Sequence, residues 1–165
     1  TVAGIGVSVA VVPGPQELAH IKGRDAGKPV AWLVATPDAL DVYGKDVPVY
    51  ARELAAEGWP GALTLVVRAN ERVPAAFQSA EGTIGLRMSA SPMAQRLIEA
   101  AGAPLAVTSA NLAGEAAPLG MDALSAAFAE RAEAAGAAFV RTRERATGTA
   151  SRVVDCTGPE PVTLR

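Results

Sequence analysis

The hydrophobic positions of this chain fall mainly in short runs that are bounded by glycine, proline or small polar residues. Five runs have the composition of buried strands, at residues 1–12, 29–35, 62–69, 83–88 and 105–107. Short runs without helical spacing are typical of strands. Gly4 and Gly6 interrupt the first run, which indicates a bend or a close backbone contact there.

Helical patterns alternate with these runs. Helices are predicted at residues 15–22, 48–58, 93–101 and 123–135, and three more strands at residues 137–141, 152–156 and 161–165. Thr36-Pro37 and Ser91-Pro92 are typical of an N-cap followed by a first helical turn, and Asp122 is expected to cap the helix that follows it. The alternation predicts one α/β domain built on a mixed sheet.

Composition narrows the class of protein. The chain has 165 residues, of which 50% are hydrophobic, and no apolar stretch approaches the roughly 18 residues that a membrane span needs. We therefore expect a soluble domain. Cys156 is the only cysteine and His20 the only histidine, which excludes an internal disulfide, a zinc site built from several thiolates or imidazoles, and a Ser-His catalytic pair. This cysteine usage fits a reducing, cytoplasmic location.

The charge of the chain indicates that any anion site is local. A net charge of −2 does not predict a broad basic face for duplex nucleic acid. One local candidate is the segment 141–152, which carries Arg141, Arg143, Arg145 and Arg152 around small residues. Free amides beside arginines could bind a phosphate, and the alternative is a solvated connection.

A polar segment after a predicted strand, residues 108–111 (TSAN), is a second candidate site. If the chain is still extended there, the Ser109 hydroxyl and the Asn111 amide project to the same side, and Ala110 points away. A hydroxyl and an amide at the carboxyl end of a strand could bind a polar ligand. The alternative is an ordinary Ser/Asn turn in which Gly114 is left-handed.

Cations in two further segments are the remaining candidate site residues. Lys22 and Arg24 flank Gly23, where the first helix is expected to end. In an extended chain they would project together, whereas at a helix C-terminus they would simply interact with the helix dipole. Arg87 is a charge in an otherwise apolar strand, which places it either at a sheet edge or facing a ligand cavity.

Taken in order, these segments resemble the YrdC-like threonylcarbamoyl-AMP synthases, which make the activated intermediate for threonylcarbamoylation of an adenosine in some tRNAs. The K-x-R and S-x-N pair is the hallmark of that family, and residues 22–24 (KGR) and 109–111 (SAN) are similar to it. Four more segments match family motifs over nearly the whole chain: TVAGIG at residues 1–6, WPGALT at 59–64, IGLR at 84–87 and SRVVD at 151–155. The resemblance implies a three-layer fold, with a twisted mixed sheet flanked by helices around a concave cavity.

The resemblance also implies a reaction and its site residues. Lys22 and Arg24 would be the catalytic cations, and the nucleotide would be bound by Lys22, Arg24, Lys28, Thr108, Ser109, Asn111, Ser151 and Arg165. The amino-acid substrate would be bound by Thr1, Arg87 and Ser151. The implied substrates are L-threonine, bicarbonate and ATP with Mg²⁺, without a metal held by the protein alone. A carbamate formed on threonine would attack the α-phosphate, so no protein nucleophile is needed. Cys156 and Asp155 would then be structural.

Some positions depart from the family pattern. Ala3 stands where the family has tyrosine, Ala113 where it has serine, and Arg152 where it has threonine. The family's first strand and helix are missing before Thr1, so we interpret residues 1–165 as a YrdC-like domain without that segment.

The implied partners are other tRNA threonylcarbamoylation proteins, RNA binding is a further implication, and no membrane is involved. A second hypothesis is a non-catalytic module of the same fold that binds nucleotide or RNA. A third, a carbamoyl-transfer domain of a hydrogenase-maturation protein, would bring cysteine-rich zinc motifs, which this chain lacks.

Overall fold

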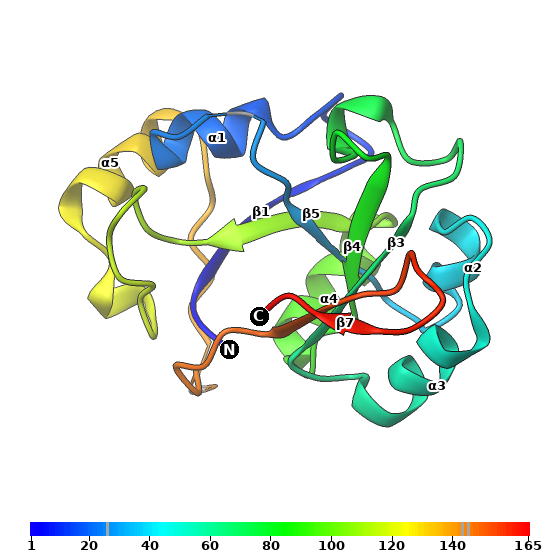
Figure 1. Ribbon diagram of the computed structural model, residues 1–165. Coiled ribbons are helices and arrows are strands. Elements are labelled where there is room, and N and C mark those ends of the chain that lie inside the picture. Colours follow the sequence, from blue (N-terminus) through cyan, green and yellow to red (C-terminus); the bar gives the residue numbers. More distant parts are fainter. Residues whose placement is uncertain (26, 143, 145) are drawn as a thin grey trace.

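A mixed β-sheet forms the centre of the molecule (Figure 1). The structure is a computed structural model that describes residues 1–25, 27–142, 144 and 146–165. Within these residues the sheet has seven strands in the order β1-β5-β2-β4-β3-β6-β7. The strands are β1 (Gly4–Ser8), β2 (Ala31–Leu33), β3 (Leu63–Arg68), β4 (Thr83–Arg87), β5 (Leu105–Ser109), β6 (Arg152–Asp155) and β7 (Val162–Thr163). The pairs β2/β4 and β3/β6 are parallel and the other neighbouring pairs are antiparallel, which confirms the predicted mixed sheet.

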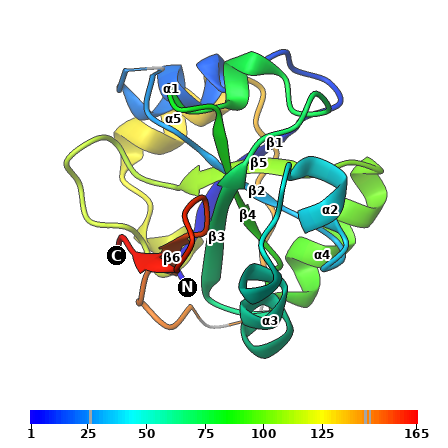
Figure 2. The same cartoon turned by 45° about the vertical axis from the view of Figure 1, so that its right-hand side comes forward.

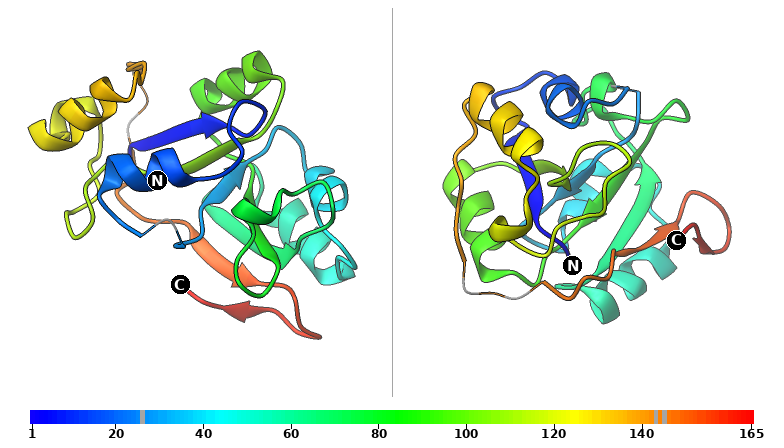
Figure 3. Two further views of the ribbon diagram at one scale, coloured as in Figure 1. Left: turned by 90° about the horizontal axis from the view of Figure 1, so that it is seen from above. Right: turned by 90° about the vertical axis from the view of Figure 1, so that its left-hand side faces the viewer.

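Helices lie on both sides of this sheet. They are α1 (Gln16–Lys22), α2 (Ala39–Tyr43), α3 (Val49–Gly58), α4 (Pro92–Ala101) and α5 (Ala126–Ala134), with 3-10 turns η1 (Ala75–Phe77) and η2 (Met121–Ala123). Figure 2 shows α2, α3 and α4 on one side of the strands, and α1 with α5 on the other. Both views in Figure 3 place α1 beside α5, and α1 also contacts β1. No helix in the described part of the chain has the length and apolarity to cross a membrane.

The main hydrophobic core covers one face of the sheet. A row of in-register residues runs across four neighbouring strands: Leu65, Leu86, Trp32 and Ala106. Each of these side chains is no more than 1% exposed. Trp32 also packs edge-on against the aromatic rings of Tyr43 and Phe77, with ring centroids 5.3 Å apart in both pairs. Because side chains alternate along a strand, the residues next to this row face the other side.

Small residues dominate the middle of that opposite face. A Cβ atom added at Gly6 would lie 2.9 Å from Val107 Cγ1, and one added at Gly85 would lie 3.3 Å from Thr64 Cγ2. The close contact predicted at Gly6 is therefore confirmed, and the face is hollowed where larger side chains would fill it. Its central row is Gly6, Val107, Ala31, Gly85, Val66 and Asp155.

Most predicted helix limits are confirmed, but two starts are wrong. Ser91 caps α4 as predicted, because its Oγ accepts a hydrogen bond from Ala94 N at 3.2 Å. The helix after Thr36-Pro37 begins later, at Ala39, with Asp38 in the N-cap position. Asp122 lies in η2 and does not cap α5. The cap is Ser125, whose Oγ accepts from Phe128 N, and it lies next to the first helical residue.

Several predicted strands are longer than the observed ones, and two differ most from the structure. The first is shorter than expected, since β1 ends at Ser8 and the chain turns over residues 9–11. Residues 137–141 form no strand, because no described strand pairs with them through backbone hydrogen bonds. Their apolar residues Phe139 and Val140 remain 37% and 41% exposed and line a cavity instead.

Candidate functional site

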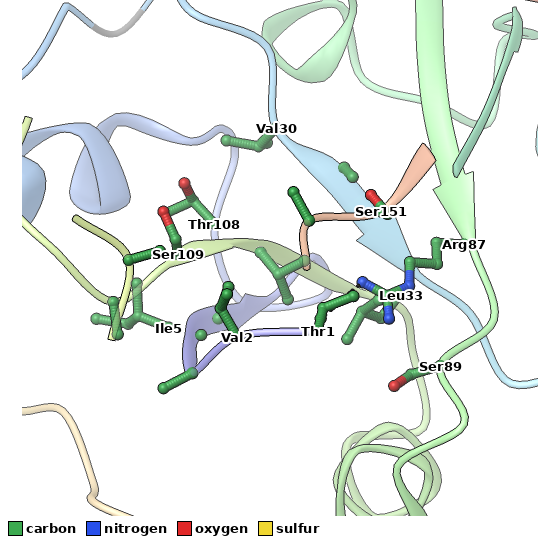
Figure 4. Close-up of a pocket in the computed structure, with 18 of the residues that line it drawn as sticks. Thr1, Val2, Ile5, Val30, Leu33, Arg87, Ser89, Thr108, Ser109 and Ser151 are labelled. Atoms are coloured by element: carbon green, nitrogen blue, oxygen red, sulfur yellow. Dashed lines mark hydrogen bonds between the residues drawn. The ribbon is translucent and has the colours of Figure 1, made fainter. Parts of the chain in front are cut away.

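A large cavity of about 1850 Å³ lies on the sheet face that carries the small residues (Figure 4). All the site residues that the family resemblance implied line it: Thr1, Lys22, Arg24, Lys28, Arg87, Thr108, Ser109, Asn111, Ser151 and Arg165. These residues come from both ends and the middle of the chain, so the fold brings together what the sequence separates. Their chemical roles stay predictions.

The C-terminal end of α1 supplies the first cationic part of the site. Gly23 follows Lys22 in a left-handed conformation (φ 61°, ψ 42°) and its N–H donates to helix carbonyls, which ends the helix as predicted. Lys22 then points inward and is only 4% exposed. Its Nζ atom donates to the carbonyl oxygens of Ser109 and Asn111 at 2.7 and 2.6 Å. It also lies 3.4 Å from Ser109 Oγ and 3.1 Å from Asn111 Oδ1.

The segment after β5 has the alternation that the sequence predicted. Ser109 and Asn111 both face Lys22, while Ala110 is buried with 4% exposure. Gly114 has a φ of 88°, so the segment is also a turn with a residue of positive φ. The two interpretations of this segment therefore apply together: it is a tight turn, and its polar side chains line the cavity.

Burial perturbs both cations of the K-x-R segment. The pKa of Lys22 is lowered to about 8, mainly by burial and also by the charge of Arg24, while Glu115 acts to raise it. Burial lowers the pKa of Arg24 as well. The Nε atom of Arg24 is shielded from solvent and has no hydrogen-bond partner among the described residues. The side chain of Arg24 lines the cavity, and a guanidinium in this place is suited to an anionic ligand.

Arg87 supplies a second cationic part. It ends β4, which lies inside the sheet between β2 and β3, so the sheet-edge alternative is wrong and the cavity alternative is confirmed. Arg87 Nε donates to Gly61 O at 2.8 Å and Nη1 donates to Thr1 Oγ1 at 3.1 Å. Burial lowers the pKa of this guanidinium too. The contacts fix the side chain in the cavity wall.

The two cationic parts are separated along the sheet. Arg87 pairs with Leu33, and Leu33 pairs with Leu105, whereas Ser109 lies further along β5. The step of four residues from Leu105 to Ser109 along β5 corresponds to about 13 Å at the usual rise of a strand. Figure 4 accordingly shows Arg87 and Ser151 on one side of the cavity, and Thr108 and Ser109 on the other. The site can therefore hold an elongated ligand with anionic groups at two positions.

Several polar residues of the cavity were missed by the sequence reasoning, and Thr64 is the one with a direct contact to a predicted site residue. Thr64 in β3 is 5% exposed, and its Oγ1 lies 2.9 Å from the Oγ atom of Ser151, which is also buried. A single hydroxyl between Leu63 and Leu65 in an apolar strand was the available signal, because it interrupts the buried pattern on the cavity side.

The remaining predicted residues lie toward the outside. Lys28 is exposed, and Arg165 pairs through its backbone with Val153, whose N–H donates to Arg165 O at 2.9 Å. In the segment 141–152, Arg141 forms an exposed ion pair with Asp122 at 2.8 Å. Arg143 and Arg145 lie outside the described residues, so the phosphate-binding hypothesis for that segment stays a prediction.

Two residues expected to be structural have structural contacts. Cys156 is buried with 1% exposure, and burial raises its pKa to about 11. Asp155 Oδ1 accepts a hydrogen bond from Thr157 N at 2.9 Å, which fixes the turn after β6. Among the described residues, no group of three or more His, Cys, Asp or Glu side chains could hold a metal ion.

Comparison with known proteins gives relatives over the full length of the chain. The chain is 33% identical over 165 residues to a threonylcarbamoyl-AMP synthase from Pyrococcus abyssi, covering 100% of this chain and 47% of the relative. It is 29% identical over 170 residues to a threonylcarbamoyl-AMP synthase from Bacillus subtilis, with the same coverage of 100% and 47%. The chain thus spans about half the length of these curated relatives.

A solved structure and a family model agree with these relatives. The crystal structure of Pyrococcus abyssi Sua5 complexed with L-threonine superposes with a TM-score of 0.89 at 33% identity, covering 100% of this chain and 47% of the other. The model of the Sua5/YciO/YrdC domain, described as "Telomere recombination", matches residues 1–165. The chain therefore belongs to the Sua5/YciO/YrdC family.

Proposed function

We propose that this chain carries the activity of a threonylcarbamoyl-AMP synthase, which converts L-threonine, bicarbonate and ATP to threonylcarbamoyl-AMP, pyrophosphate and water. The names of two curated relatives support this activity. The observation that carries the proposal is the contact of Lys22 with Ser109 and Asn111 in a cavity that Arg24 and Arg87 also line. This site offers cations, hydroxyls and amides, and the proposed reaction needs those groups.

The reaction joins three small anionic or zwitterionic molecules. The amine of threonine attacks the carbon of bicarbonate, and loss of water leaves a carbamate. A carbamate oxygen then forms a bond to the α-phosphorus of ATP, and the bond from that phosphorus to the bridging oxygen breaks, which releases pyrophosphate. Catalysis therefore depends on holding two anions together and on offsetting charge on the phosphate oxygens.

The two cationic parts of the site would bind different substrates. Arg24, which lines the cavity, would bind the phosphates, and Lys22 would fix the Ser109 and Asn111 segment beside them. Arg87 would bind the carboxylate of threonine, because a guanidinium matches a carboxylate in shape and charge. The similar Sua5 structure is a complex with L-threonine, which supports an amino-acid subsite in this cavity. Mg²⁺ would enter with the ATP phosphates as part of that substrate.

The product would serve tRNA threonylcarbamoyladenosine synthesis in the cytoplasm, together with other proteins of that modification. Binding of RNA by this chain is part of the same proposal. The names of the relatives support the modification pathway, and the partners are inferred from the chemistry of the product.

An assay of pyrophosphate release tests the activity. The purified chain is incubated with ATP, Mg²⁺, bicarbonate and labelled threonine, and the expected result is pyrophosphate release that requires both threonine and bicarbonate. Arg24→Met should abolish most of this release, while Arg68→Met, an exposed arginine outside the cavity, should not change it. Nucleotide binding without threonine-dependent turnover would contradict the proposal and favour a non-catalytic module.

A further inference from the structure

Glu115 is the last residue of the cavity segment formed by residues 109–115, and it is the one residue of that segment that does not line the cavity. One carboxylate oxygen, Oε2, accepts a hydrogen bond from Leu112 N at 3.0 Å and another from Ser125 Oγ at 3.0 Å. The carbonyl oxygen of Glu115 accepts a third from Asn111 Nδ2 at 2.7 Å. A single exposed glutamate thus contacts Asn111 and Leu112 within the segment and one residue outside it.

The residue outside the segment connects Glu115 to a packed helix. Ser125 is the N-cap of α5. On the buried side of α5, Phe128 packs in a small hydrophobic cluster with Ile21 of α1 and Ala110 of the segment. The carboxylate of Glu115 therefore ties the segment to a helix that also packs against α1, the helix that ends at Lys22.

Within the segment, the amide of Asn111 has all its groups in use. Its Nδ2 atom donates to the carbonyl oxygens of Leu112 and Glu115, at 3.1 and 2.7 Å, and its Oδ1 atom accepts from Lys22 Nζ at 3.1 Å. Two carbonyls can accept only from an NH₂ group, so this network leaves one orientation for the amide. The position of the Leu112–Glu115 turn consequently decides where Asn111 holds Lys22.

We propose that Glu115 is a positioning residue for the reaction: through Leu112 and Ser125 it holds the 109–115 segment in the geometry that keeps Lys22, Ser109 and Asn111 in place. The proposal rests on the proposed function for its kinetic part. Glu115 acts through the segment and touches no substrate, so its removal should reduce kcat more than it weakens substrate binding. The charge of Glu115 also raises the pKa of Lys22, which adds a second link between the two residues.

Two substitutions separate the hydrogen bonds from the charge. Glu115→Ala removes both hydrogen bonds of Oε2, and kcat should fall on the order of 10- to 100-fold, because small displacements of catalytic groups have effects of this size. Glu115→Gln keeps an oxygen that can accept from both donors, since a single oxygen accepts them in the native contact, and it should retain most of the wild-type kcat. Glu57→Ala, at an exposed glutamate of α3, is the matched control and should leave kcat unchanged.

Amide hydrogen exchange gives a readout that does not depend on turnover. Glu115→Ala should speed exchange of the Leu112 N–H, while exchange in β3 and β4 stays as in the wild type. If Glu115→Ala keeps both the wild-type kcat and the protection of Leu112, the proposal is overturned. Equal loss of kcat in the alanine and glutamine variants would also overturn it. If the wild-type chain shows no turnover and Glu115→Ala still speeds exchange of the Leu112 N–H, the proposed function is refuted and the positioning contact is retained.

Discussion

Replacing Lys22 by methionine removes an ammonium group from the centre of the site and keeps an unbranched side chain of similar length. The carbonyl oxygens of Ser109 and Asn111 then lose donors that lie 2.7 and 2.6 Å away. Ser109 O keeps a hydrogen bond from Asn111 N at 3.0 Å and so loses one of two bonds, at about 0.5–1.5 kcal/mol. Asn111 O is left with no donor among the described residues, at about 1–3 kcal/mol, so the two together cost about 1.5–4.5 kcal/mol. Methionine carries no charge, so the cost of burying the Lys22 ammonium group, which lowers its pKa, is removed at the same time. This gain offsets part of the lost stability.

The expected net change is a loss of about 1–3 kcal/mol in the free energy of unfolding. For a chain of this size, 1 kcal/mol shifts Tm by about 2–4 °C, so Tm should fall by roughly 2–12 °C. Urea unfolding followed by tryptophan fluorescence measures the change, because Trp32 and Trp59 are both buried. Lys45→Met is the matched control at an exposed lysine and should stay within about 0.5 kcal/mol of the wild type. Equal unfolding free energies for the two methionine variants would refute the reasoning.

Three further predictions concern the site. The rate should fall as pH rises through about 8, where Lys22 loses its proton. Glu115→Gln removes a charge that raises the pKa of Lys22, so it should move this fall to lower pH. An unmoved pH–rate profile would contradict the assignment of the fall to Lys22. Arg24→Met should weaken ATP binding by about 10- to 100-fold, since a charge-assisted hydrogen bond is worth roughly 1.5–3 kcal/mol, as calorimetry can measure. Thr64→Val keeps the shape of the side chain but removes the hydrogen-bond partner of Ser151. It should lower the free energy of unfolding by about 1 kcal/mol and raise KM for threonine. An unchanged KM would place Ser151 outside the threonine subsite.

Local patterns were sufficient for most elements of the fold. The strands β3 and β4 and the helices α3 and α4 follow from runs of apolar residues and from capping residues that act within a few positions of each other. The strand predicted at residues 137–141 failed because a strand needs a partner, and pairing is decided by the whole sheet. The apolar residues of that stretch line the cavity.

The candidate site needed information beyond local spacing. Alternation along β5 correctly placed Ser109 and Asn111 on one side, but nothing near residue 22 in the sequence shows that Lys22 meets them. That contact was expected only from the resemblance to a family motif. Thr64 was missed because its partner Ser151 lies far along the chain, next to the start of β6. The pairing of β3 with β6 brings the two hydroxyls together.

The position of β5 between β1 and β2 has a consequence for how the protein is made. Both neighbours of β5 are synthesised long before it, so β1 and β2 cannot be joined until the chain beyond residue 105 has emerged and inserted between them. The same insertion carries Ser109 and Asn111 to Lys22. A nascent or prematurely ended chain that lacks this strand can possess Lys22 without the carbonyl oxygens that accept its hydrogen bonds in the complete fold. Substrate can therefore stabilise only molecules in which β5 is already in place, and it offers no assistance to earlier stages of assembly.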